Sequence, residues 1–195
     1  MTLPQAAIEA TYSYAEYLHW NDQERWELIN GDIWDMSPAP SRLHQEISIR
    51  LSSVLYQHFK QKDCAVYAAP FDVRLPEQED AEDEAVTTVV QPDISVICDQ
   101  NKLDERGCIG APDLIVEILF PATAAKDLKV KRDLYEQHGV KEYWLFHPTD
   151  HTVMVYRLGA DNQYGKAEIF TKDDLLRSRL CAELEIELAA IFPKA

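Results

Sequence analysis

The chain has 195 residues, 46% of them hydrophobic and 27% charged, which is the composition of a globular protein with a sizeable core. Acidic residues outnumber basic residues by 34 to 19, and the resulting net charge of -15 argues against non-specific binding to nucleic acid. No apolar run is long enough to cross a membrane, and the N-terminus lacks the pattern of a signal peptide, so we expect a cytoplasmic protein with no membrane partner.

The four cysteines, Cys64, Cys98, Cys108 and Cys181, are scattered along the chain and form no Cys-X-X-Cys pair. This distribution is typical of reduced thiols in a reducing compartment. The sequence therefore predicts neither a disulfide framework nor a zinc site.

The N-terminal part carries two strong local signals. Ser13 followed by Glu16 forms a capping box, which predicts a short helix. Asn30-Gly31 between two alternating runs predicts a β-hairpin with a two-residue turn. We expect this helix and hairpin to occupy about residues 13–36.

Hydrophobic periodicity predicts the remaining elements. In chain order they are a helix over residues 41–59, strands over 65–75, 85–98 and 113–119, a helix over 123–139, two strands within 141–158, and a short final helix over 184–192. This order predicts a mixed α/β (α+β) sheet covered by helices. Because the chain has no repeats and no linker, we expect a single domain over residues 1–195.

Three ionisable side chains fall on positions that the pattern predicts to be covered. Asp93 lies inside an apolar strand behind Pro92, Glu117 shares a strand face with apolar residues, and Lys131 lies on the apolar stripe of the second helix. Two close carboxylates repel each other, and a divalent cation between them removes that cost. Oxygen ligands favour Mg²⁺ or Mn²⁺ over zinc. Taken singly, each residue also fits an ordinary strand-end or snorkelling side chain.

With these residues in place, the chain resembles the PD-(D/E)XK nuclease superfamily, and most closely a bacterial branch described as restriction endonucleases, formerly a domain of unknown function. The resemblance spans roughly Ser13 to Phe192. Four stretches carry it: "RWELINGDIWDMSPAPSRLHQEI", "VVQPDISVICDQNKLDERGCIGAPDLIVEIL", "ATAAKDLKVKRDLYEQHGVKEYWLF" and "TVMVYRL". It implies a restriction-endonuclease-like core, a curved mixed sheet flanked by helices.

The resemblance also implies site residues. Asp93 and Glu117 would be catalytic and would bind Mg²⁺, with Mn²⁺ as a possible substitute. The superfamily places its lysine two residues after the second acid, where this chain has Leu119. Lys131 is therefore the third catalytic candidate, and Lys129 is an alternative to it. A further departure is Phe120, where relatives carry a serine.

Four other polar residues are candidates for a supporting role. Nucleases of this type often use a glutamate of the first helix, which indicates Glu46, and His44 and Gln45 lie in the same family motif. Glu27 in "WELING" is a second acidic candidate. For each of them a solvated or capping side chain is the competing interpretation.

The function implied is a Mg²⁺-dependent endonuclease that hydrolyses phosphodiester bonds in nucleic acid, with DNA as the expected substrate. Two alternatives stay open: a non-catalytic scaffold that keeps the nuclease fold, and a metal-dependent hydrolase of small phosphate compounds, which the acidic charge would suit. Edge strands and predicted exposed aromatic residues favour a homodimer; these residues are Trp34, Tyr143, Trp144 and Tyr156.

Overall fold

The computed structural model describes residues 11–20, 25–36, 39–78, 81–121 and 123–193. Its centre is a six-stranded sheet in the order β12-β11-β10-β9-β6-β3. Only β9 and β10 pair in parallel within this sheet. The strands are β3 (Ala65–Ala68), β6 (Ile94–Ile97), β9 (Leu114–Ile118), β10 (Glu142–His147), β11 (Thr152–Arg157) and β12 (Glu168–Thr171).

A second six-stranded sheet has the order β2-β1-β5-β4-β8-β7. Its strands are β1 (Trp26–Ile29), β2 (Asp32–Asp35), β4 (Val73–Arg74), β5 (Val89–Val90), β7 (Leu103–Asp104) and β8 (Gly107–Ile109). A separate pair of strands, β13 (Leu175–Arg177) and β14 (Glu185–Glu187), follows near the C-terminus. The protein is thus a mixed α/β structure with most of its regular residues in strands.

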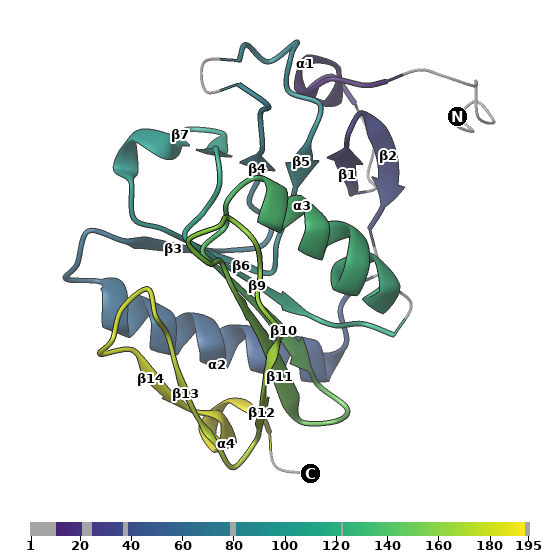
Figure 1. Ribbon diagram of the computed structural model, residues 1–195. Coiled ribbons are helices and arrows are strands. Elements are labelled where there is room, and N and C mark those ends of the chain that lie inside the picture. The colour runs from purple at the N-terminus through teal and green to yellow at the C-terminus, as the bar shows by residue number, and fades with distance from the viewer. Residues whose placement is uncertain (1–10, 21–24, 37–38, 79–80, 122, 194–195) are drawn as a thin grey trace.

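Few helices cover these sheets. They are α1 (Tyr14–Tyr17), α2 (Arg42–Phe59), the 3₁₀ turn η1 (Gln100–Lys102), the π-helical segment η2 (Lys126–Lys131), α3 (Arg132–Gln137) and α4 (Leu188–Ile191). Figure 1 shows α2 across one face of the central sheet and α3 on the opposite side. The η2–α3 segment also makes the crossover that the parallel pair β9–β10 requires.

Strand β9 shows how the two faces differ. Leu114, Val116 and Ile118 pack in the core cluster under α2, whereas Ile115 and Leu119 pack in the cluster under α3. Alternation along the strand therefore directs Glu117 to the α3 face. An acidic side chain is held against a covered surface, as the sequence pattern indicated.

The N-terminal signals are confirmed. Both hydrogen bonds of the capping box between Ser13 and Glu16 are present at α1. Asn30 and Gly31 join β1 to β2 with φ angles of 55° and 81°, the left-handed conformations that a two-residue hairpin turn requires.

Two predicted strands are wrong as single elements. The segment 85–98 divides into β5 and β6, and the segment 65–75 divides into β3 and β4, so each segment contributes to both large sheets. The breaks contain Pro92 and Pro70, which have no N–H to donate to a ladder. The final helix is also shorter than predicted, because residues 185–187 pair as β14 before α4 begins.

The prediction of four reduced cysteines is wrong for one pair. Cys64 and Cys98 form a disulfide across β3 and β6. Since Ala65 pairs with Ile97, the register places the two cysteines opposite each other. In the described part of the chain no helix is long and apolar enough to cross a membrane. Cytoplasmic localisation stays a prediction.

Two aromatic residues invoked for a dimer surface are in the core. Tyr143 and Trp144 on β10 are fully buried, one on each face of the central sheet. Trp34 and Tyr156 are half-buried. Tyr143 and Trp144 therefore cannot contribute to a dimer contact, and the homodimer stays a prediction that rests on the other features.

Candidate active site

Asp93 lies where the chain passes from the second sheet into the central one. Ile94 pairs with Val116, so continuing the register places Asp93 beside Glu117. The Asp93 carboxylate accepts a hydrogen bond of 2.7 Å from the backbone N–H of Ile118, and its Oδ2 lies 3.2 Å from Nε2 of His44. The side chain keeps 20% of its surface exposed. Asp93 is thus fixed in place but still accessible from outside.

Glu117 is the more deeply buried residue of the predicted acidic pair, with 5% of its surface exposed. Its Oε1 lies 2.7 Å from Nζ of Lys131 and accepts a hydrogen bond of 3.0 Å from the Tyr135 hydroxyl. Both donors come from the η2–α3 segment that covers this face. The helix therefore fixes the orientation of a carboxylate on the sheet below it.

Lys131 is buried among carboxylates, whereas Lys129, the alternative lysine, is exposed. Besides Glu117, the Lys131 ammonium lies 2.8 Å from Oε1 of Glu27 and 3.8 Å from Oδ1 of Asp127. The π-helical segment buries both Asp127 and Lys131. Such segments are frequent at functional sites.

Glu27 brings the second sheet into the same site. It is fully buried on β1, and its Oε1 accepts a hydrogen bond of 3.0 Å from the backbone N–H of Gln91. Its other oxygen lies 2.6 Å from Nζ of Lys126. Glu27 therefore holds Lys126 and Lys131, two of the lysines of η2, against the junction of the two sheets.

Charge in this buried group is unbalanced. Four carboxylates, of Glu27, Asp93, Glu117 and Asp127, face two ammonium groups, of Lys126 and Lys131, which leaves a formal charge of -2 when all are ionised. The guanidinium of Arg25, on the exposed rim, donates to Gln91.

Burial, together with the neighbouring carboxylates, raises two of the acid pKa values. Burial and the neighbouring carboxylates raise the pKa of Glu117 to about 8, although Lys131 opposes the shift. Burial and Glu27 raise the pKa of Asp127 to about 6 in the same way. For Glu27 burial is outweighed by Lys131 and Lys126, and the pKa falls to about 2.

These groups line a pocket of about 290 Å³. His44 and Gln45 reach it from the start of α2, and Phe120 also lines it. The donor set is made of oxygens, and its four carboxylates outnumber the two ammonium groups. A hard divalent cation fits both properties, which makes Mg²⁺ or Mn²⁺ chemically suitable for this pocket.

Of the residues singled out in the sequence, the structure brings six together: Glu27, His44, Gln45, Asp93, Glu117 and Lys131. Glu46 is the exception, because it is not among the residues that line the pocket and pairs instead with Arg42 on the outer side of α2. Sequence reasoning missed Lys126 and Asp127. A signal was present for Asp127, which precedes Lys131 by four residues and so shares its helix face.

The fold is similar to that of a solved structure. A crystal structure titled "a putative nuclease belonging to DUF820", from Anabaena variabilis, matches with a TM-score of 0.73 at 25% identity, over 93% of this chain and 97% of that chain. The chain belongs to the Uma2 family, described as "Putative restriction endonuclease", whose model matches residues 14–190. An uncharacterised protein of Synechocystis is 28% identical over 152 residues, which are 76% of this chain and 75% of that protein. The family resemblance inferred from the sequence is confirmed.

Proposed function

We propose that this protein is a Mg²⁺-dependent endonuclease that hydrolyses phosphodiester bonds, with DNA as the substrate. One observation carries the proposal: Asp93, Glu117 and Lys131 meet in a single pocket in which four carboxylates outnumber two ammonium groups. The proposal includes a restriction-endonuclease-like core made of β6, β9 and β10 with α2 and α3, within one domain.

Asp93 and Glu117 would hold the cation, with Asp127 near enough to Lys131 to influence the same site. When bound, Mg²⁺ or Mn²⁺ supplies Lewis-acid polarisation of the phosphate and lowers the pKa of a water ligand. The protein contributes orientation. Tyr135 fixes Glu117, and His44 lies in contact with Asp93.

Lys131 acts as a cation in this scheme. Burial would lower the pKa of its ammonium, but Glu117, Glu27 and Asp127 outweigh burial and raise it well above its usual range. A protonated lysine donates hydrogen bonds and stabilises the negative charge that develops on the phosphate. It does not act as the general base in this charge environment.

A hydrolase of small phosphate compounds is the second candidate. Several of the basic residues that a polymer substrate would require are neutralised by acidic neighbours. Arg132 pairs with Asp133 and Glu136, and Lys141 pairs with Asp113. A small phosphate substrate needs no extended basic surface, so this pairing favours the second candidate over a polymer with many contacts.

The test is cleavage of supercoiled plasmid and of single-stranded DNA in Mg²⁺, in Mn²⁺ and in EDTA. The proposal predicts metal-dependent cleavage that Asp93→Asn abolishes. Glu46→Gln is the matched control, since Glu46 is a half-buried acid of the adjoining helix that is paired away from the pocket. Equal DNA cleavage by the wild type and Asp93→Asn would refute the nuclease proposal. Turnover of nucleotides without cleavage of DNA would support the second candidate.

A further inference from the structure

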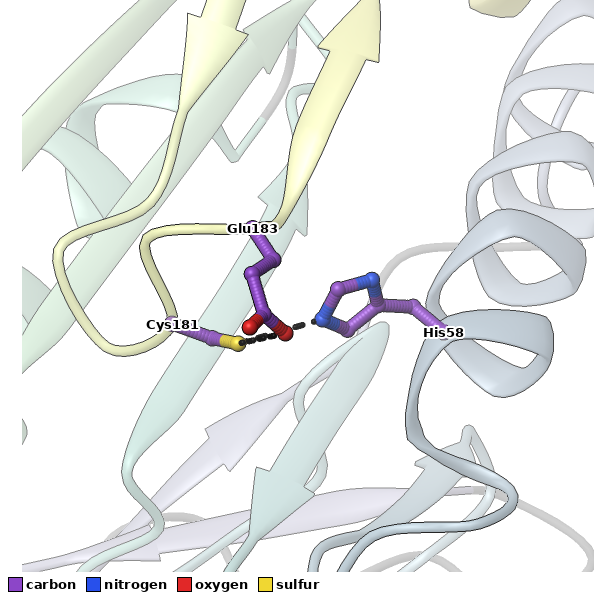
Figure 2. A group of neighbouring side chains, drawn as sticks. All are labelled: His58, Cys181 and Glu183. Carbon is purple, nitrogen blue, oxygen red and sulfur yellow. Dashed lines mark hydrogen bonds between the residues drawn. The ribbon is translucent and has the colours of Figure 1, made fainter.

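A second group of metal-ligating side chains lies apart from the nuclease pocket. His58 is in the last turn of α2, and Cys181 and Glu183 are in the loop between β13 and β14 (Figure 2). Nε2 of His58 lies 3.2 Å from Sγ of Cys181, which lies 4.0 Å from Oε2 of Glu183. None of the three lines the pocket that contains Asp93.

A fourth side chain shows that this position attracts positive charge. Nζ of Lys62 lies 3.0 Å from Nε2 of His58, 3.1 Å from Sγ of Cys181 and 2.6 Å from Oε2 of Glu183. A nitrogen, a sulfur and an oxygen from segments more than a hundred residues apart in sequence thus converge on one ammonium group. Because the Lys62 side chain is 35% exposed and flexible, it can move into solvent and vacate this position.

The chemistry of the three ligands selects a type of cation. Imidazole, thiolate and carboxylate are the ligands of Zn²⁺ and similar borderline-soft ions, whereas Mg²⁺ takes oxygen ligands. Bonds of 2.0 to 2.3 Å in a tetrahedron separate ligand atoms by about 3.3–3.8 Å. The ligand atoms here all lie within 4.8 Å of one another, so small side-chain rotations suffice to close the site.

We propose that His58, Cys181 and Glu183 bind a Zn²⁺-class ion, with the Lys62 ammonium as the group that the ion displaces. Three protein ligands leave a fourth position for water or for a group supplied by another molecule. The ion would link the end of α2 to the β13–β14 loop. This loop precedes α4, which packs on α2. This site is independent of the oxygen-ligand pocket and has a different metal preference.

The test uses Co²⁺ as a spectroscopic substitute for Zn²⁺, added to the full-length protein with its disulfide intact. Cys108 and Cys181 are then the free thiols, and Cys108 is buried. We expect one equivalent of Co²⁺ to give a thiolate charge-transfer band and Zn²⁺ to abolish it. Cys181→Ser should remove the band, and His58→Gln should weaken binding at least about tenfold.

Two further variants separate a metal site from a simple ionic cluster. Lys62→Met should strengthen Co²⁺ binding, because the competing ammonium is gone, and Cys108→Ser should leave it unchanged. Asp93→Asn should retain the thiolate band, which separates this site from the nuclease pocket. Absence of the band in the wild type and in Lys62→Met, or its persistence in Cys181→Ser, would overturn the proposal.

Discussion

Two buried glutamates on neighbouring strands of the central sheet have opposite surroundings. Glu142 on β10 is 1% exposed, and Glu117 on β9 is 5% exposed. Glu142 accepts hydrogen bonds from the indole of Trp144 at 2.8 Å and from the backbone of Leu180 at 3.1 Å, and its Oε1 also accepts from the backbone of Arg179. Donors of the protein therefore satisfy both oxygens of the Glu142 carboxylate.

The hydrogen-bonding capacity of the Glu117 carboxylate is satisfied less fully. The hydrogen bonds that it receives from described residues both go to Oε1, and three other carboxylates lie in the same pocket. A buried carboxylate is stable when donors surround it and costly when further carboxylates do. The difference favours a structural role for Glu142, whereas Glu117 lies in the pocket for which we propose a bound cation.

The largest effect should come from replacing Lys131, the lysine that pairs with Glu117. Lys131→Met should lower the rate of metal-dependent cleavage by about 10²–10⁴-fold, because the charge that develops on the phosphate loses its donor. Lys129→Met, two residues away and exposed, should leave the rate nearly unchanged. Single-turnover cleavage assays on both variants measure this difference. Similar rates for the two variants would remove Lys131 from the mechanism.

The variant Glu142→Gln tests whether Glu142 stabilises the folded protein. The amide places an NH₂ group where an oxygen now accepts backbone N–H groups, so unfolding should become easier by about 2–4 kcal/mol. Denaturation by urea measures the loss. Metal binding in the pocket should persist in the folded variant. A stable Glu142→Gln protein that fails to bind Mn²⁺ would contradict the distinction between the two glutamates.

Local patterns were sufficient to predict much of this arrangement. The Asn30-Gly31 turn, the long amphipathic helix and the inward face of Lys131 each depend on residues a few positions apart. Alternation along β9 likewise predicts the face on which Glu117 lies. The proximity of Asp93, Glu117 and Lys131 followed from the family resemblance, because three separate patterns do not fix a tertiary contact.

What sequence reasoning missed depends on pairing between distant segments. The disulfide requires the β3–β6 register, and the spacing of Cys64 and Cys98 gives no sign of it. The roles of Lys126 and Asp127 depend on Glu27, which arrives from the second sheet. Glu46 was misplaced because a helix periodicity specifies the apolar stripe but not which of its flanking positions faces a pocket.

Metal addition tests whether Glu117 is a metal ligand. At a hundredfold excess over Kd, a bound Mg²⁺ or Mn²⁺ ion stabilises the folded state by about 2.7 kcal/mol, which raises the Tm by about 5–10 °C for a chain of this size. Glu117→Gln should abolish the shift, and Glu46→Gln should retain it. Thermal unfolding with and without the metal at matched ionic strength measures both. A full shift in Glu117→Gln would exclude Glu117 as a ligand.

The pH dependence of stability in EDTA follows from the raised pKa of Glu117. The pKa of Glu117 rises from 4.5 to about 8 on folding, so between these values the folded protein holds a proton that the unfolded chain has lost. Stability should therefore fall as pH rises, by up to about 1.4 kcal/mol per pH unit, and level off above the folded pKa. Glu117→Gln has no such proton and should show a flatter profile. Subtracting the two urea-denaturation profiles isolates Glu117 from other titrating groups, and parallel profiles would show that its neighbours do not hold the proton on this carboxylate.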